Sequence, residues 1–267
     1  MSWLSSRPYF KPVNNMQAFF TFVAELKDFL PPNRRDVTSA YPFEGTPSIK
    51  HLIEALGIPH TEVHHIVVND KVVDFSYLVQ DDDHIRIYPY STQYNDTNQS
   101  EEIILSDSEP LFILDNHLGR LANYLRMMGF DTLYRNDFQD DELAIIASQE
   151  DRILLTRDRR LLMRSVIRDG YWVRAKVPRQ QVIEILKRFN LYHKITPFRR
   201  CMRCNDLLQP VDKGEVIDRL EPLTKKYYNT FRICHGCGQV YWQGSHYARM
   251  EKFIDQVKHS QSINLNS

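Results

Sequence analysis

Four cysteines fall into two pairs late in the chain, and each pair has the spacing of a metal-binding knuckle. Two such turns bring four thiolates together, as in the closed tetrahedral site of a structural Zn²⁺. Disulfides are the alternative, but the first residues lack the apolar stretch of a secretion signal, and the cytosol is reducing. The spacing therefore predicts a structural zinc site formed by Cys201, Cys204, Cys234 and Cys237.

Three aspartates occupy comparable places in a pattern of alternating strands and helices. Asp115 directly follows an apolar run, Asp158 follows another, and Asp140 begins a predicted helix. Since the carboxyl ends of parallel strands share one edge of a sheet, where ligands usually bind, these carboxylates are expected to converge. Carboxylates hold Mg²⁺ or Mn²⁺, which activates water for phosphodiester hydrolysis. Aspartate is also a common helix cap and turn residue, which is the structural alternative.

The elements that must position these aspartates lie between residues 111 and 195. Short apolar runs at 111–114, 132–134, 153–156 and 171–175 predict strands, and helices are expected to begin near 118, 140, 161 and 178. The third helix is expected to carry Leu161, Leu162, Ser165 and Val166. Strands separated by helices need crossover connections, so the sequence predicts an α/β fold with a mainly parallel sheet.

The N-terminal part has a different order of elements. Strands are predicted near 17–22, 37–43, 65–68, 71–75 and 85–90, with one helix over 46–57 that starts with a cap residue and proline. This order, with two strands before the helix and the other strands after it, resembles the β-grasp fold of ubiquitin and of small sulfur carriers. Those carriers act through a free Gly-Gly tail, whereas this chain continues, so a binding or scaffolding role is expected instead.

Charge divides the chain unequally, although the formal net charge is zero. Residues 1–95 hold 8 Lys and Arg against 11 Asp and Glu, and residues 96–110 add five acids and no base. Residues 111–267 hold 26 bases against 18 acids. A basic C-terminal part suits a polyanion, because binding phosphates releases counterions. The other interpretation is a basic surface balanced by its acidic neighbour.

Residues 111 to about 255 resemble the PIN-like ribonuclease family named after the C-terminal domain of the mut-seven exonuclease, in which a nuclease unit precedes a zinc ribbon. The N-terminal unit resembles the ubiquitin-like domain found ahead of this nuclease in some bacterial proteins. The matching stretches are Leu114-Asp115, Leu118-Gly119-Arg120-Leu121-Ala122, Tyr124-Leu125-Arg126, Gly129-Phe130-Asp131, Asp140-Asp141-Glu142-Leu143, Arg152-Ile153-Leu154-Leu155-Thr156-Arg157-Asp158 and Tyr241-Trp242-Gln243-Gly244-Ser245-His246.

The resemblance implies that Asp115, Asp140 and Asp158 bind the catalytic Mg²⁺ or Mn²⁺, and that RNA is the substrate. Asp141 is the alternative to Asp140. Successive side chains on a helix point about 100° apart, so only one of this pair is expected to face the metal. The spacing to the following apolar residues favours Asp140.

Arginines near these aspartates are candidates for contacts with phosphate, because a guanidinium can donate two parallel hydrogen bonds. Arg120 and Arg157 are the first candidates and Arg126 is the third, although any of them can instead pair with an aspartate. In the predicted ribbon, Tyr241 and Trp242 near Arg203 suit unpaired bases, but these rings can equally fill a small core.

The sequence therefore predicts a β-grasp domain over 1–91, an acidic linker over 92–110, a PIN-like nuclease domain over 111–195 and a zinc ribbon over 196–257. We expect a metal-dependent ribonuclease whose ribbon assists RNA binding, with a protein partner for the N-terminal domain. The alternatives are a non-catalytic RNA-binding adaptor and a β-grasp scaffold. No apolar run reaches the roughly 18 residues of a membrane span, and a cytoplasmic location is expected.

Overall fold

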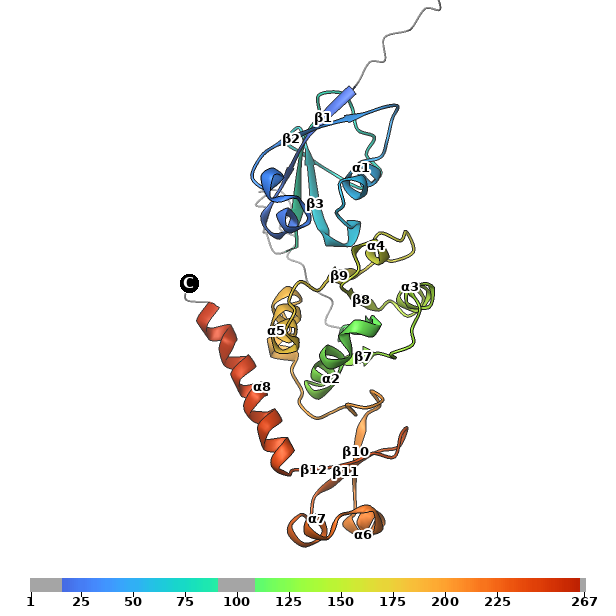
Figure 1. The fold of residues 1–267 in the computed structure, drawn as a ribbon, viewed down its shortest axis with the longest axis vertical. Helices are drawn as coiled ribbons and strands as arrows, with labels where there is room; N and C mark the ends of the chain where they lie inside the picture. The colour runs from blue at the N-terminus through green and yellow to red at the C-terminus, as the bar shows by residue number, and fades with distance from the viewer. Residues whose placement is uncertain (1–15, 91–108, 265–267) are drawn as a thin grey trace, which may run out of the picture. The chain divides into compact units, whose positions relative to one another are not determined.

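The computed structural model describes residues 16–90 and 109–264. The chain divides into two compact units, Met1–Tyr94 and Asn95–Ser267, and each is described here by itself (Figure 1). Residues 92–108 of the predicted acidic linker lie outside the described residues. Within the described parts of the chain, no helix combines the length and the apolar character that crossing a membrane requires.

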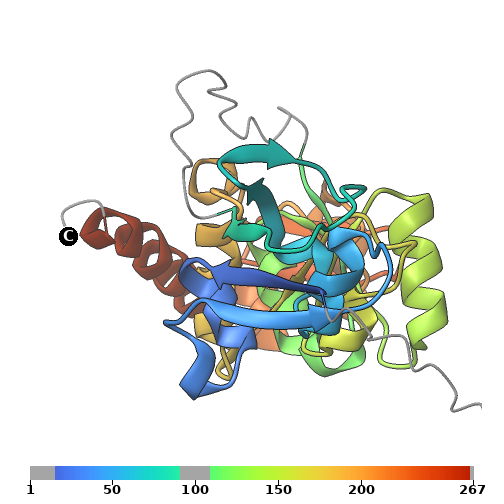
Figure 2. The same ribbon diagram turned by 90° about the horizontal axis from the view of Figure 1, so that it is seen from above.

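The first unit is a mixed five-stranded sheet with the order β2-β1-β5-β3-β4. Its central strands β1 and β5 are parallel, and its other neighbours are antiparallel; Figure 2 shows β1 and β2 side by side. This arrangement confirms the predicted β-sheet domain. Its elements are β1 (Met16–Phe22), η1 (Ala24–Phe29), η2 (Pro32–Arg34), β2 (Ser39–Phe43), α1 (Ile49–Ala55), η3 (His60–Glu62), β3 (Val63–Val68), β4 (Lys71–Val73) and β5 (His84–Pro89).

Local chemistry sets two of these boundaries. The helix α1 begins later than predicted, because the hydroxyl of Ser48 accepts a hydrogen bond from the His51 N–H at 3.3 Å and caps it. Between β3 and β4, Asn69 and Asp70 both have positive φ, 47° and 65°, as a two-residue hairpin turn requires.

The second unit contains a four-stranded sheet in which every neighbouring pair is parallel, with the order β7-β6-β8-β9. This confirms the predicted parallel α/β domain. Its elements are β6 (Leu111–Leu114), η4 (Asn116–Leu118), α2 (Gly119–Met127), β7 (Asp131–Leu133), α3 (Asp140–Gln149), β8 (Ile153–Thr156), α4 (Arg159–Leu162), β9 (Gly170–Trp172), α5 (Pro178–Arg188) and η5 (Tyr192–Lys194).

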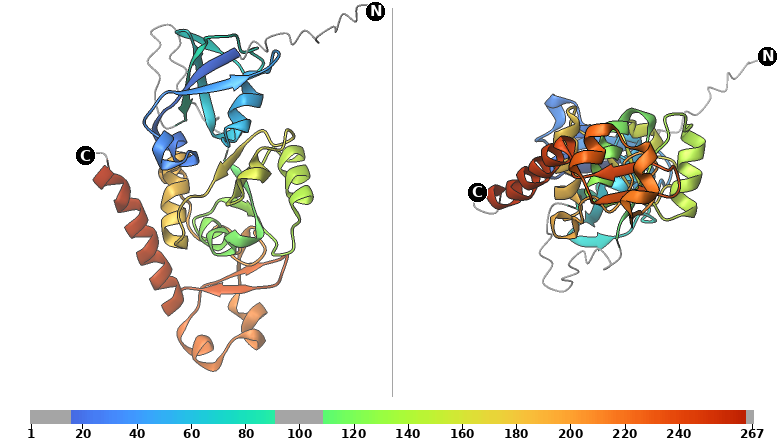
Figure 3. Two further views of the ribbon diagram at one scale, coloured as in Figure 1. Left: turned by 45° about the horizontal axis from the view of Figure 1, so that its top comes forward. Right: turned by 90° about the horizontal axis from the view of Figure 1, so that it is seen from below.

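Helices cover both faces of this sheet, so its central strands are apolar on both sides. Along β6, Phe112 and Leu114 pack with α2 and α5 on one face, whereas Ile113 packs with α3 and α4 on the other. The long helix α8 (Ser245–Asn264) adds Phe253 and Ile254 to the first core. Figure 3 shows α8 on the α5 side of the sheet. The sequence did not predict that a helix after the ribbon packs against the core of the sheet domain.

The helix expected to include Ser165 and Val166 is shorter than predicted. It ends at Leu162, and the next residues form turns closed by hydrogen bonds between residues three apart. Because of these turns, Ile167 enters the core beside Leu161 and Leu162, while Val166 is half exposed. The expectation for Ser165 and Val166 was therefore wrong.

The last part of the chain forms an antiparallel three-stranded ribbon, as predicted. Its small core contains Val216, Leu220, Phe231 and Val240, and two short helices are inserted between its first two strands. The elements are β10 (Leu208–Val211), α6 (Lys213–Val216), η6 (Ile217–Arg219), α7 (Pro222–Tyr227), β11 (Phe231–Cys234) and β12 (Val240–Trp242).

Candidate functional site

The carboxylate of Asp115 is buried at the carboxyl end of the central strand β6. Its Oδ1 accepts a hydrogen bond from the His117 N–H at 2.9 Å, which caps η4. Its Oδ2 accepts from the Arg157 N–H at 3.0 Å and from the hydroxyl of Thr156. These bonds cross from β6 to the end of β8, because Leu114 and Leu155 are neighbours in the sheet. Asp115 is thus a fixed anion at this edge.

Asp158 follows β8 and lies at the same edge. Its N–H donates to the Thr156 hydroxyl oxygen at 2.9 Å, and its Oδ1 accepts from the Arg160 N–H at 2.8 Å, which caps α4. The single hydroxyl of Thr156 therefore connects the carboxylate of Asp115 with the main chain of Asp158. The structure places these two predicted residues at one edge of the sheet, but this connection joins the Asp115 carboxylate to the main chain of Asp158 and not to its carboxylate.

Asp140 and Asp141 begin α3, and a guanidinium lies beside them. Arg164 forms an ion pair with Asp141, and this hydrogen bond, together with the charges of Asp140 and Asp158, raises the pKa of Arg164. Arg164 thus contacts one of the four predicted acids and is influenced by the charge of two others. Arg164 was not singled out from the sequence, because it comes from the turn after α4.

The carboxylates do not form a ready coordination sphere in this conformation. Among the residues that the structure describes, the four cysteines are the only group of three or more potential ligands that lies close enough together to hold a metal ion. The donor chemistry of the acids nevertheless fits a hard divalent cation, because carboxylate oxygens are the ligands that Mg²⁺ and Mn²⁺ prefer.

A groove of about 820 Å³ opens beside Asp115, between the parallel-sheet domain and the first cysteine knuckle. Its lining includes Tyr134 and Tyr241 but no acidic residue. A concave, positively charged surface attracts polyanions and concentrates them. The basic residues of the lining are His117, Arg120, Arg126, Arg157, Lys176 and Arg203.

Four cationic groups of this groove have no acidic partner. Within residues 16–90 and 109–264, no ion pair involves the side chain of Arg120, Arg157, Lys176 or Arg203. A charge that no carboxylate neutralises is available to a bound anion. Elsewhere in this unit, the arginines that form ion pairs include Arg135, Arg152, Arg164, Arg168, Arg199 and Arg200.

Arg126 differs from the other arginines of the groove. Its side chain is 2% exposed, and its guanidinium donates to the carbonyl oxygens of Thr132, Tyr134, Met202 and Arg203 at 2.9–3.4 Å. These bonds use most of its donors. The geometry therefore favours a role in joining the knuckle to the sheet domain over the phosphate contact that the sequence suggested.

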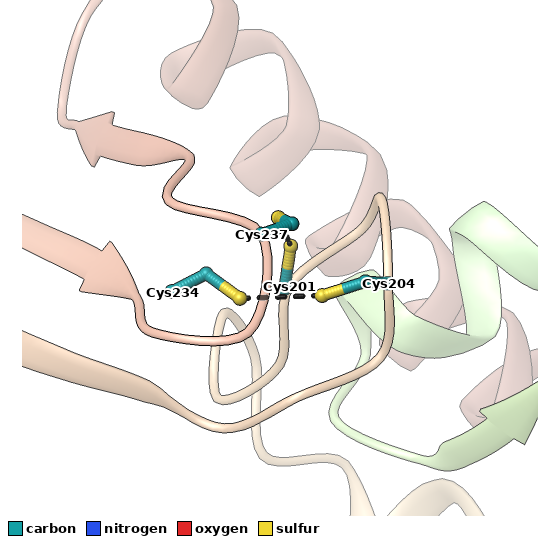
Figure 4. Close-up of side chains that lie close together, drawn as sticks. All are labelled: Cys201, Cys204, Cys234 and Cys237. Carbon is teal, nitrogen blue, oxygen red and sulfur yellow. Dashed lines mark hydrogen bonds between the residues drawn. The ribbon is translucent and has the colours of Figure 1, made fainter.

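The four cysteine thiols lie together and are free of disulfides (Figure 4). Their sulfur atoms all lie within 4.8 Å of one another, with 3.6 Å between Cys201 and Cys237 and 3.2 Å between Cys204 and Cys234. Tetrahedral Zn–S bonds of about 2.3 Å place sulfurs roughly 3.8 Å apart. The four residues therefore fit a metal ion such as Zn²⁺, as the spacing predicted.

The hydroxyl of Tyr241 connects this metal centre with the groove. It lies 3.1 Å from the sulfur of Cys201, and the same tyrosine lines the groove. Burial raises the pKa of the Cys201 thiol, but the hydrogen bonds from Tyr241 and from main-chain N–H groups outweigh burial and lower this pKa to about 7. A more acidic thiol is a better metal ligand near neutral pH.

A partly buried polar network around Asp131 connects the knuckle to the sheet. Its carboxylate accepts hydrogen bonds from Arg152 at 2.8 Å and from the Asn205 amide at 3.0 Å, and it pairs with Arg200 at 3.1 Å. The Thr132 N–H donates to the amide oxygen of Asn205 at 2.9 Å. Burial raises the pKa of Asp131, but these partners outweigh it and hold the pKa below its usual value.

Sequence reasoning did not find Lys176, Tyr134 or Gln181 as groove residues. Lys176 follows β9 at the same edge of the sheet as Asp115 and Asp158, so its place after a strand was the available signal. No comparable signal marked Tyr134 or Gln181.

Comparison with protein families gives two matches. The family model described as Mut7-C RNAse domain matches residues 110–254, which is more than half of the chain. The model described as Mut7-C ubiquitin matches residues 15–95. These matches confirm the predicted family and its domain order. No curated protein and no solved structure matches the chain.

We predict that Asp131→Asn lowers the free energy of unfolding by about 2 kcal/mol, because it removes the carboxylate that Arg152 and Arg200 share at a partly buried site, where solvent makes the loss smaller than for a fully buried pair. Chemical denaturation of the metal-loaded protein measures this change. The pKa of Asp131 is depressed in the folded state, so its contribution is present above the usual value of 3.8 and is lost as the pH falls through the lower, folded-state pKa.

The difference between wild type and variant should therefore shrink in acid. As a control, Asp137→Asn removes an exposed carboxylate that also pairs with an arginine, and it should change stability little. Equal effects of the two substitutions at neutral pH would contradict the assignment.

We also predict that Tyr241→Phe weakens metal binding by about tenfold, because groups that orient metal ligands typically contribute this much. Loss of the hydroxyl removes a bond that lowers the Cys201 pKa, so protons should displace zinc at a higher pH than in wild type. A colorimetric chelator followed across pH measures the release. Tyr247→Phe is the matched control. This tyrosine also belongs to the C-terminal part of the chain, but its ring packs on Phe198.

Proposed function

Because the chain belongs to the Mut7-C RNAse domain family, we propose that it is a divalent-metal-dependent ribonuclease that hydrolyses RNA phosphodiester bonds. One observation carries the proposal beyond the family. A groove with basic residues and no acidic lining runs beside the strand ends that hold Asp115 and Asp158. A polyanion attracted to the groove is therefore brought to the carboxylates.

Asp115, Asp140 and Asp158 are the proposed ligands of Mg²⁺ or Mn²⁺, with Asp141 as the neighbouring acid. Their support is that Asp115 and Asp158 follow neighbouring parallel strands, and that the negative charges of Asp141, Asp140 and Asp158 together raise the pKa of Arg164. When bound, such an ion supplies an activated water and neutralises charge on the phosphate. Asp115 is oriented by three donors, two of which bind Oδ2 and one Oδ1, so Oδ1 keeps a lone pair for a metal ion.

Arg120 and Arg157 are the proposed phosphate contacts. Arg157 directly precedes Asp158, and Arg120 is the second residue of α2, which follows directly on the short helix η4 that Asp115 caps. Both line the groove without an acidic partner among the described residues, so their guanidinium groups can hold phosphate oxygens and offset negative charge that develops during cleavage. Lys176 adds a third cation at the same edge. No covalent enzyme intermediate is required.

The ribbon is proposed to hold a structural zinc ion through its four cysteines and to assist RNA binding. Its support is that Arg203 and Tyr241 bring a cation and a ring from the ribbon to the groove. For the N-terminal domain we propose a protein partner, because the ubiquitin-like match marks a fold used in binding. We retain 1–91, 92–110, 111–195 and 196–257 as the proposed domain boundaries, and a cytoplasmic location.

Asp158→Asn provides the sharpest test of catalysis. Asparagine can still accept the hydrogen bond that caps α4, so the fold is kept while one ligand charge is removed. We expect cleavage of single-stranded RNA in Mg²⁺ or Mn²⁺ to fall at least about 100-fold, beyond the loss typical of groups that merely orient ligands. Fluorescence anisotropy should show that RNA binding is retained.

Asp151→Asn is the control, because this exposed carboxylate pairs with Arg168 rather than lying among the predicted metal ligands. If wild-type protein binds RNA but no divalent ion supports cleavage, the chain is an adaptor instead. Asp115 is a poorer choice for this test. Its carboxylate accepts three hydrogen bonds, and the NH₂ group of an asparagine there would face at least one of these donors instead of accepting from it.

Arg120→Gln and Arg157→Gln test the groove itself. Each should weaken RNA binding and reduce the steepness of its salt dependence by about 0.7 in the slope of log affinity against log salt, the value for one phosphate contact on a single strand. Titrations at several salt concentrations measure the slope. Arg168→Gln serves as the control, because this arginine is exposed and paired outside the groove. Unchanged slopes in both groove variants would exclude the groove as the RNA site.

A further inference from the structure

The knuckle that carries the first two cysteines also forms one wall of the groove. Met202 and Arg203 lie between Cys201 and Cys204 in the sequence, and both line the groove. The opposite wall comes from α2, which contributes Arg120 and Asn123. The width and shape of the groove therefore depend on how the knuckle is held against α2.

Arg126 makes the first connection between these walls. It lies on α2, and its buried guanidinium donates to the carbonyl oxygens of Met202 at 3.2 Å and Arg203 at 3.0 Å. The same guanidinium donates to the carbonyl oxygen of Thr132 at 2.9 Å. One planar group thus bridges the helix, the edge strand β7 and the knuckle. These bonds form only when the knuckle presents its carbonyl groups in this orientation.

Charge strengthens this connection. No carboxylate lies in an ion pair with Arg126 among the described residues, and burial lowers its pKa. A negative charge on Cys204 or Cys201, such as a metal-bound thiolate carries, acts against burial and raises this pKa, as does the nearby carboxylate of Asp131. Four thiolates around one divalent ion leave a net negative site, so a loaded metal centre is a favourable neighbour for this buried cation.

Asn205 makes the second connection, directly after Cys204. Its amide accepts a hydrogen bond from the Thr132 N–H and donates to Asp131, so it extends the edge of β7. Its main chain has a φ of 79° and closes the knuckle through a bond from its N–H to the Cys201 carbonyl oxygen at 2.9 Å. Folding of the knuckle around a metal therefore also sets the position of this amide.

We propose that Arg126 and Asn205 are positioning residues that transmit the folding of the zinc knuckle to the RNA groove, so that zinc and RNA bind with positive linkage. The inference rests on the proposed function, since it names the regulation of the same groove. Loss of zinc frees the carbonyl groups of the knuckle and the Asn205 amide from their bonds to α2 and β7. The groove wall that carries Arg203 and Tyr241 is then no longer held in position. By reciprocity, bound RNA raises the affinity for zinc by the same factor.

The test measures zinc affinity in competition with a chelator of known affinity, with and without a saturating single-stranded oligouridylate. The protein is the full chain with Asp158→Asn, so that the RNA is not cleaved. We expect RNA to tighten zinc binding by about fivefold or more, the lower end of typical coupling between sites. The apo protein should bind the same oligouridylate more weakly by the same factor.

Asn205→Gly is the decisive variant, because glycine accepts the positive φ while the bridging amide is removed. It should retain most of the zinc affinity measured without RNA but lose the linkage. Asn190→Gly is the matched control, since Asn190 also has positive φ, 49°, and lies in an exposed turn after α5. This control should keep the full linkage. Arg126→Lys, which keeps the charge but not the planar fork, should lower the linkage as well.

Equal zinc affinity with and without bound RNA in the parent protein would overturn the inference and leave the proposed ribonuclease activity standing. Full linkage in Asn205→Gly would overturn the positioning role of this residue. Failure of the zinc-loaded parent to bind any RNA would overturn the proposed function and this inference together. A melting temperature near that of the parent establishes that Asn205→Gly is folded.

Discussion

The guanidinium of Arg126 is a buried cation without a carboxylate partner among the described residues, and this constrains the entire second unit. Removing it from water is costly unless its donors are satisfied, and they are satisfied by carbonyl groups more than seventy residues apart in the sequence. The parallel sheet and the knuckle must therefore meet in one arrangement. That arrangement places the metal centre, the groove and the acidic strand ends within one continuous region.

The end of β8 separates two regions of opposite charge. Arg157 lines a groove that has no acidic residue, whereas Asp158, the next residue, lies in the group of acids around Arg164. Successive residues after a strand point in different directions, so one turn of chain serves both regions. This separation of charge supports the proposed mechanism, because metal-assisted phosphodiester hydrolysis requires a polyanion and a divalent cation at neighbouring positions.

Local patterns predicted most of the fold, and distant contacts account for what they missed. The spacing of Cys201 and Cys204 and the strand that ends before Asp115 each depend on a few neighbouring residues, and both were predicted. The role of Arg126 depends on carbonyl groups of the knuckle, which no local pattern encodes. At Val166 a local pattern gave a wrong prediction. The apolar spacing was helical, but turns after α4 place Ile167 in the core instead.

The ribbon depends on the sheet domain because its own core is small. The cores around Phe231 and around the cysteines each contain few buried side chains, so metal binding and docking must contribute much of its stability. The chain enters the ribbon through bonds from the Thr196 and Phe198 N–H groups to the end of α2. It leaves through α8, where Phe253 packs into the core of the sheet domain. Held at both ends, the ribbon has little freedom to move away from the groove, so changes within the knuckle are transmitted to the groove wall rather than absorbed by a linker.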